Sequence, residues 1–205
     1  MKVLIINGSP HVEGNTATAI KEMVKIFTAE GIESQVIHIG TKDIRGCTAC
    51  GNCIDTGKCV FNDIVNETAP LFEAADGLVV ASPTYYASAN GTIISFLDRL
   101  FYSTHFDKTM KVGASVVVAR RGGAVATFDE LNKYFTMTQM PVASSQYWNM
   151  VYGRIVREAE NDAEGLQTMR TLSKNMVFLM KSITLGKEKF GLPAKEEWIG
   201  THFIR

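Results

Sequence analysis

The stretch that decides the fold is KVLIINGSPHVEGNT, residues 2–16. Residues 2–7 are apolar almost throughout, which is typical of a parallel strand covered on both faces. Gly8 and Gly14 allow the backbone to turn sharply, and a helical pattern of apolar residues begins near Asn15. The stretch therefore predicts a strand, a loop (residues 8–16, the first loop) and a helix in immediate succession.

The rest of the chain repeats this alternation of strand and helix. Further strands are predicted at 34–39, 77–82, 112–119 and 142–146, and helices at 15–30, 65–75, 91–104, 127–135 and 162–185. Such alternation is typical of an α/β fold with a parallel sheet. Five strands fit the doubly wound order 2-1-3-4-5, in which ligands bind beyond the carboxyl ends of the strands. We expect one domain over residues 1–185 and a tail over 186–205.

Composition and charge weigh against several classes of partner. The chain has 205 residues, 46% of them hydrophobic and 20% charged, with a net charge of +0. Nucleic acids and membrane surfaces usually require a basic face, so we expect neither as a partner. No apolar run approaches the roughly 18 residues of a spanning helix, and the first residues enter a strand rather than a signal peptide. These features predict a cytoplasmic protein, in which thiols stay reduced.

The first loop has the chemistry of an anion site. Ser9, Asn15 and Thr16 supply polar side chains, and the start of the helix supplies unpaired N–H groups. No Gly-Lys-Ser/Thr follows, as a P-loop would need, and the Gly-x-Gly-x-x-Gly pattern of dinucleotide sites is missing. The loop therefore favours a phosphate monoester, with an ordinary capped helix entry as the alternative.

Two further loops follow the next predicted central strands. Residues 82–91, the second loop, read SPTYYASANG, and a proline with two tyrosines suits the packing of a flat ring. Residues 119–124, the third loop, read ARRGGA, and their cations suit a flavin or a nicotinamide phosphate. Taken singly, these loops also fit a helix-entry turn and a solvated basic loop. Together with the first loop, they predict a site for a phosphorylated planar ring.

With these motifs the chain resembles the NADPH-dependent FMN reductases, and within them the iron–sulfur flavoproteins. The resemblance covers roughly residues 1–185 and is carried by NGSP (7–10) with GNT (14–16), SPTY (82–85) with DR (98–99), and RGG (121–123). It implies a flavodoxin-like fold, FMN as cofactor, NAD(P)H as electron donor, and a homodimer or homotetramer with the flavin near the subunit boundary. We interpret Asp98-Arg99 as a structural ion pair.

The resemblance also implies which residues hold the flavin. The phosphate would be held by Ser9, His11, Asn15, Thr16 and Ala17. The isoalloxazine would be lined by Pro83, Thr84, Tyr85, Tyr86, Ala87 and Ser88, and covered by Arg120, Arg121, Gly122 and Gly123. Position 11 is commonly Arg or Lys in the family, so His11 is a departure from its pattern.

All four cysteines lie in one irregular segment, residues 41–62, which we call the cysteine loop. Cys47, Cys50, Cys53 and Cys59 form a Cys-x2-Cys-x2-Cys-x5-Cys run. Structural zinc usually takes two pairs separated by a longer spacer, whereas three cysteines at two-residue gaps resemble a ferredoxin run. A [4Fe–4S] cluster, redox-active thiols and, less favoured, zinc are the three alternatives. The same spacing marks the iron–sulfur flavoproteins.

We therefore expect an FMN-dependent oxidoreductase that takes electrons from NAD(P)H and passes them to an unidentified acceptor, through a cluster if one is present. The chemistry would belong to the cofactor, so binding residues are predicted and catalytic side chains are not. A non-enzymatic electron carrier and a redox-sensing protein are the alternatives.

Overall fold

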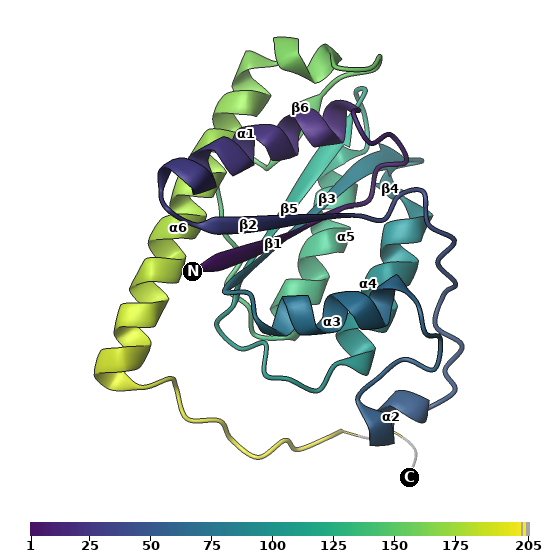
Figure 1. Ribbon diagram of the computed structural model, residues 1–205, viewed down its shortest axis with the longest axis vertical. Helices are drawn as coiled ribbons and strands as arrows, with labels where there is room; N and C mark the ends of the chain where they lie inside the picture. Colours follow the sequence, from purple (N-terminus) through teal and green to yellow (C-terminus); the bar gives the residue numbers. More distant parts are fainter. Residues whose placement is uncertain (202, 204–205) are drawn as a thin grey trace.

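A parallel sheet forms the centre of the protein (Figure 1). The computed structural model describes residues 1–201 and 203. Its parallel strands are β1 (Lys2–Asn7), β2 (Glu33–His38), β3 (Gly77–Tyr85), β5 (Val112–Ala119) and β6 (Met150–Tyr152). They lie in the order β2-β1-β3-β5-β6, and the two-residue strand β4 (Ser88–Ala89) pairs antiparallel with the end of β3. Without β4, this is the order 2-1-3-4-5, so the predicted flavodoxin-like α/β fold is confirmed.

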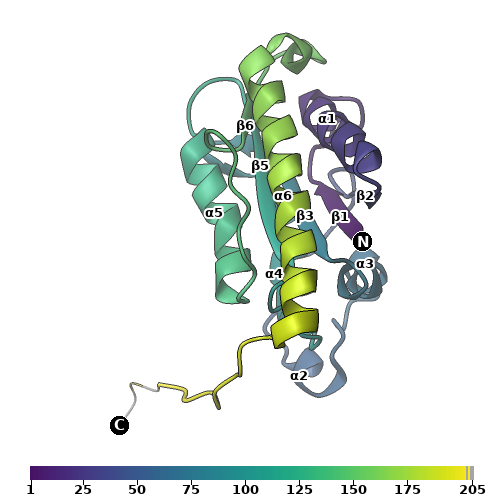
Figure 2. The same ribbon diagram turned by 90° about the vertical axis from the view of Figure 1, so that its left-hand side faces the viewer.

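Helices cover both faces of the sheet (Figure 2). On one face α1 (Asn15–Ala29) and α6 (Ala163–Phe190) share a core with side chains such as Val3 and Ile5. On the other face α3 (Ile64–Glu73), α4 (Gly91–Ser103) and α5 (Ala124–Met137) pack on Leu4 and Ile6. Alternate residues of β1 thus enter different cores, which explains why this strand is a continuous apolar run. Two short helices complete the fold: α2 (Asn52–Thr56) and the 3-10 helix η1 (Glu158–Asn161), whose Ala159 enters the core of α1 and α6.

The last strand was predicted in the wrong place. It lies at Met150–Tyr152, whereas the predicted segment 142–146 contributes a single parallel bridge between Val142 and Gly113. Both segments carry short apolar runs that follow α5, and periodicity alone does not decide which of them pairs with β5. The choice is made by tertiary contacts, beginning with the N–H of Val117, which donates to the carbonyl of Asn149.

The end of α6 also differs from the sequence prediction. The helix continues through residue 185, where we placed the domain boundary, and ends at Phe190 before Gly191 in the left-handed region, with φ of 75°. The residues described beyond it, 191–201 and 203, are all exposed. His202, Ile204 and Arg205, which our prediction assigned to the tail, lie outside the described residues. No helix in residues 1–201 has the length and hydropathy to cross a bilayer.

The sheet order brings the three predicted loops to one edge. β1 and β5 are the two neighbours of β3 in the sheet, and all three strands are parallel. The carboxyl ends of the three strands therefore lie side by side. β1 leads into the first loop, β3 into the second and β5 into the third. This edge is where doubly wound folds bind ligands.

Candidate functional site

The first loop is curled by its own backbone and side chains. The N–H of Ser9 donates to Asn7 Oδ1 at 3.0 Å, and the N–H of His11 donates to Ser9 Oγ at 3.1 Å. Ser9 is buried and His11 is exposed. A Cβ at Gly40 would stand 1.9 Å from the carbonyl oxygen of Ser9, so only glycine allows the chain after β2 to pass this close. The loop thus has a fixed shape.

Helix α1 begins at this loop with free donors. Its N-cap is Gly14, and no side chain caps the helix start among the described residues. The first N–H groups of such a helix have no partner within the helix, and the dipole makes this end favourable for an anion. Glu13 lies beside these groups, but its exposed carboxylate pairs with Lys21, which holds the pKa of Glu13 below its usual range. The arrangement can bind a phosphate through backbone N–H groups.

The side chain of Asn15 has a different set of partners. Its Nδ2 donates to the carbonyl of Ile155 at 2.9 Å, and its Oδ1 accepts from the N–H of Ala159 at 3.0 Å. Gly153 lies against it, because a Cβ there would stand 2.8 Å from Asn15 Cγ. The amide therefore ties the start of α1 to the segment after β6, a contact that the sequence did not reveal. At Asn15, the backbone N–H is the group left for an anion.

The second loop forms a tight β-hairpin at the end of β3. Tyr85 pairs with Ser88, so Tyr86 and Ala87 make a two-residue turn, with φ of 51° and 60°. Two positive φ values define a type I′ turn, which normally uses Asn and Gly because other residues are strained there. Tyr86 is fully exposed at this turn. Strain of this kind clusters at binding sites, where the surrounding structure holds it in place.

Contacts from α5 and the third loop hold this hairpin. Glu130 accepts hydrogen bonds from Ser88 Oγ at 2.9 and 3.0 Å and from the N–H of Ala89 at 2.7 Å. Gly123 has φ of 87°, and a Cβ there would stand 2.7 Å from Ala87 Cα. Arg120, Arg121 and Gly122 are exposed at the same edge. The first loop lies alongside, because Gly8 packs closely on Ile93 of α4. The predicted flavin residues of the three loops are thus on neighbouring segments.

One buried polar atom of the hairpin lacks a partner. Thr84 Oγ1 is inaccessible to solvent and makes no hydrogen bond to any residue that the structure describes. A buried hydroxyl without a partner is unfavourable unless a ligand or water satisfies it. Thr84 lies between Pro83, which is partly buried, and Tyr85, whose ring is exposed.

The cysteine loop brings its four thiols to one small cavity. Cys47 and Cys50 are exposed, Cys53 is buried on α2, Cys59 is half-buried, and no disulfide joins them. The cavity that they line measures about 20 Å³, which is room for about one water molecule. Burial raises the pKa of the Cys53 thiol, and the other three sulfurs raise it further. Among residues 1–201 and 203, no three His, Cys, Asp or Glu side chains are placed to hold a metal ion.

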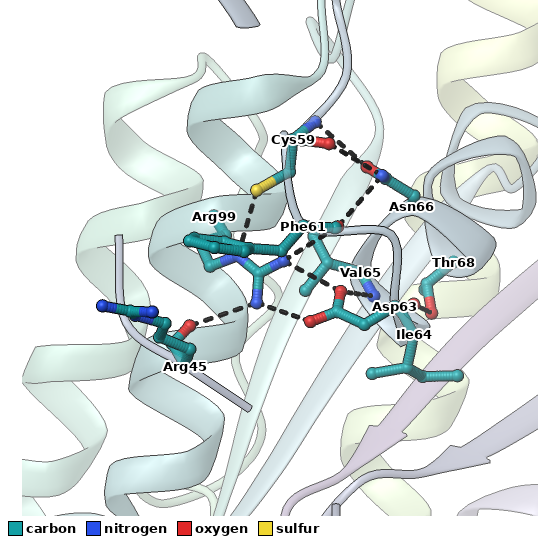
Figure 3. Close-up of polar contacts among 9 residues, drawn as sticks. All are labelled: Arg45, Cys59, Phe61, Asp63, Ile64, Val65, Asn66, Thr68 and Arg99. Carbon is teal, nitrogen blue, oxygen red and sulfur yellow. Dashed lines mark hydrogen bonds and ion pairs between the residues drawn. The ribbon is translucent and has the colours of Figure 1, made fainter. Parts of the chain in front are cut away.

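Arg99 of α4 is buried beneath this loop (Figure 3). Its Nε donates to Cys59 Sγ at 3.1 Å, and its Nη atoms pair with Asp63 at 2.7 and 2.9 Å. The predicted ion pair between Asp98 and Arg99 is wrong: Asp98 is exposed and accepts from the hydroxyl of Tyr134 at 2.5 Å. Adjacent residues of a helix point in different directions, which explains the error.

A larger groove separates the cysteine loop from α5. It has a volume of about 1050 Å³, and its walls include Cys47 and Ile54 on one side and Tyr134 and Met137 on the other. Glu130, which holds the hairpin, also lines it. Neither periodicity nor motif spacing predicted this groove, because its walls come from segments far apart in the chain.

Comparison with known proteins shows the family and the fold. The family model described as NADPH-dependent FMN reductase matches residues 1–154. An iron–sulfur flavoprotein of Methanocaldococcus jannaschii is 31% identical over 191 residues, covering 89% of this chain and 99% of its own length. One from Methanosarcina thermophila is 29% identical over 194 residues, covering 92% and 100%. A solved flavodoxin from the domain Archaea has a TM-score of 0.60 at 15% identity, covering 88% and 99%, which shows the shared fold. The chain therefore belongs to the NADPH-dependent FMN reductase family.

Proposed function

We propose that the protein is an FMN-dependent oxidoreductase that takes electrons from NAD(P)H and passes them to an acceptor through a [4Fe–4S] cluster in the cysteine loop. The observation that carries the proposal is the arrangement at the carboxyl ends of β1, β3 and β5. There an uncapped helix start lies next to a strained, firmly held hairpin. The family match supports FMN as the cofactor and an oxidoreductase activity.

The first loop and the start of α1 would bind the FMN phosphate. The N–H groups of Asn15, Thr16 and Ala17 belong to the first turn of α1, where N–H groups lack partners in the helix. Ser9 lies buried beside them, and His11 lies on the exposed side of the loop. Since Asn15 uses its side-chain amide elsewhere, we assign the main phosphate contacts to the backbone. The dipole of α1 adds to them.

The second and third loops would bind the ring. The hydroxyl of Thr84 is buried without a partner in the described chain, which fits a hydrogen bond to a ligand. Tyr86 presents an exposed ring on a rigid turn, and Arg120 and Arg121 supply charge at the same edge. FMN supplies, when bound, the redox chemistry that these side chains lack. The protein would orient the ring and limit the access of water to it.

The donor chemistry of the cysteine loop fits an iron–sulfur cluster. Four free thiols line one cavity, and a cubane cluster takes four thiolates. Cys47, Cys50, Cys53 and Cys59 would be the residues that hold it. A cavity with room for about one water means that the loop must widen to accept a cluster. Two relatives that match over nearly their whole length are named iron–sulfur flavoproteins.

We also propose that the protein acts in the cytoplasm as a homodimer or homotetramer. Large apolar side chains of the tail, Trp198, Ile199 and Phe203, are between 85% and 90% exposed. Exposed apolar side chains gathered in one segment often mark a contact with another chain. Analytical ultracentrifugation of the full chain tests this part of the proposal, and a monomer at all concentrations would contradict it.

The function is tested by a visible spectrum of anaerobically purified protein, with flavin, iron and zinc analysis on the same sample. We expect one FMN per chain and about four irons per chain. Rapid mixing with NADPH and with NADH should then bleach the flavin absorbance. Protein that takes up no FMN would contradict the proposal as a whole, iron-free protein would contradict the cluster, and inertness toward both nucleotides would favour a carrier.

A further inference from the structure

We propose that Arg99 is the positioning residue of the cysteine loop: its Nε–H holds the Cys59 sulfur in place and stabilises the negative charge of that sulfur as a cluster ligand. The inference rests on the proposed function, because it concerns a cluster held by this loop. Hydrogen bonds to ligand sulfurs are one of the ways in which a protein sets the potential of a cluster. Figure 3 shows the network that surrounds the guanidinium.

The guanidinium of Arg99 is fixed because all five of its N–H donors have acceptors. Nε donates to Cys59 Sγ at 3.1 Å. Nη1 donates to Asp63 Oδ2 at 2.7 Å and to the carbonyl of Arg45 at 3.1 Å. Nη2 donates to Asp63 Oδ1 at 2.9 Å and to the carbonyl of Phe61 at 3.3 Å. Because every donor already has an acceptor, the guanidinium has one favoured orientation, in which Nε is directed at the Cys59 sulfur.

The acceptors of Arg99 are themselves held by the fold. Asp63 is the N-cap of α3, and its Oδ1 also accepts from the N–H of Val65 at 3.1 Å. Arg99 lies on α4 and is 1% exposed, so its ion pair with Asp63 joins two helices of the same layer. A bidentate pair of this kind has a defined geometry, which a lysine does not reproduce. The pair with Asp63 therefore anchors the guanidinium to the domain, and the carbonyls of Arg45 and Phe61 join it to the loop.

Arg99 is the cation that contacts the Cys59 sulfur. The ring of Phe61 is near two cations, with Arg45 at 5.3 Å and Arg99 at 5.1 Å from its centroid. Asp63 is the carboxylate that pairs with Arg99, and Arg45 is exposed. An anionic sulfur is stabilised by a neighbouring cation, and burial of Arg99 strengthens the interaction because water screens it less.

The two ends of the cysteine loop differ in how firmly they are held. Cys59 is fixed by Arg99 and by Asn66, which accepts from the N–H of Cys59 at 3.0 Å and donates to its carbonyl at 2.9 Å. Cys47 and Cys50 are exposed. Because the cavity would have to widen for a cluster, the exposed end of the loop is the end with room to move. Arg99 therefore holds the ligand around which the others assemble.

The test compares Arg99→Gln and Arg99→Lys with the control Arg45→Gln in the full FMN-loaded chain, reconstituted anaerobically with iron and sulfide. Arg45 is a matched control, because its guanidinium lies near the same Phe61 ring and carries the same charge, but it makes no hydrogen bond to the Cys59 sulfur. The reduction potential of the cluster is measured by spectroelectrochemical titration. Hydrogen exchange over residues 45–62 is measured in iron-free protein, and FMN content reports whether each variant folds.

Both Arg99 variants should disfavour the reduced cluster by about tenfold, which lowers the one-electron potential by about 59 mV. Exchange near Cys59 should also become faster in both variants, while Arg45→Gln matches the wild type. Should Arg99→Gln fail to fold, Arg99→Lys decides, since it keeps the buried charge and removes the Nε–H. Wild-type protein that takes up no iron overturns the proposed cluster and this inference with it. If iron is bound and the Arg99 variants match the wild type, the inference alone is wrong.

Discussion

Gly123 offers the sharpest test of whether the second and third loops together form the flavin site. Replacing it with alanine puts a Cβ at 2.7 Å from Ala87 Cα and 2.8 Å from Ala87 Cβ. Carbon atoms that are not bonded prefer about 3.5–4.0 Å, so one of the two loops must move. The hairpin cannot easily give way, because Ala87 already has φ of 60° and Glu130 holds its next two residues.

Two costs add in this variant. Alanine at φ of 87° is strained by about 1–3 kcal/mol, and the overlap with Ala87 resembles overpacking, which costs about 1–3 kcal/mol. We therefore expect the free energy of unfolding to fall by at least about 2 kcal/mol. If the loops enclose the flavin, the affinity for FMN should fall at least about tenfold, since 1.4 kcal/mol corresponds to a factor of ten.

The neighbouring glycine is a matched control. A Cβ at Gly122 would meet no described atom within 4 Å, and its φ is outside the positive range. Gly122→Ala should therefore leave stability unchanged or raise it by up to about 1 kcal/mol. Urea unfolding of the apoprotein and fluorescence titration with FMN measure both variants. If Gly123→Ala were as stable as Gly122→Ala and bound FMN equally well, the two loops would not meet as described.

Three further predictions follow from contacts at the same edge and in the tail. Glu130→Gln should lower the free energy of unfolding by about 1 kcal/mol, because hydrogen bonds from Ser88 Oγ and the N–H of Ala89 lose a charged acceptor; an unchanged urea midpoint would contradict this. Asn15→Ala should lower the free energy of unfolding by about 1–2 kcal/mol through its two lost hydrogen bonds, while FMN affinity changes less than fivefold. Calorimetry and FMN titration measure the two quantities, and a loss of affinity without a loss of stability would mean that the amide binds the phosphate. Truncation after Phe190 removes the exposed ion pair of Lys195 with Asp107. Hydrogen bonds from Lys195 and Thr109 lower the pKa of Asp107 to about 2, so the pair is intact at pH 7, and as an exposed pair it is worth at most about 1 kcal/mol. A larger drop in thermal stability would show that the tail packs on its own domain or on another chain.

The layered fold was predictable from the sequence because its signals are local. A strand such as β1 is buried on both faces, so its composition alone identifies it. The position of β6 was not predictable, since Val142 and Met150–Tyr152 lie in similar short apolar runs and only pairing with β5 distinguishes them. The end of α6 was missed because its last turns carry polar residues without an apolar stripe.

The candidate site was predictable to a different extent. The glycines and polar residues of the first loop indicate an anion site through local chemistry, which needs no knowledge of distant contacts. The bond from Asn15 to Ala159 and the support of Ser88 by Glu130 join residues 144 and 42 positions apart. Without an alignment, a sequence carries no signal for such pairs. The type I′ turn was hidden for another reason, because Tyr86 and Ala87 are residues that this turn rarely uses.

Helix α4 connects the two halves of the proposed function. Its N-cap Asn90 closes the hairpin, because its N–H donates to Ser82 Oγ at 3.0 Å and its side chain accepts from the N–H of Thr92 at 2.7 Å. Arg99 follows nine residues later, about 13 Å along the helix axis, and contacts Cys59 there. One rigid helix thus fixes the hairpin at its start and a cysteine sulfur further on. The separation between flavin and cluster would then be set by α4 and not by the loops, so lengthening the cysteine loop should leave the position of Cys59 unchanged.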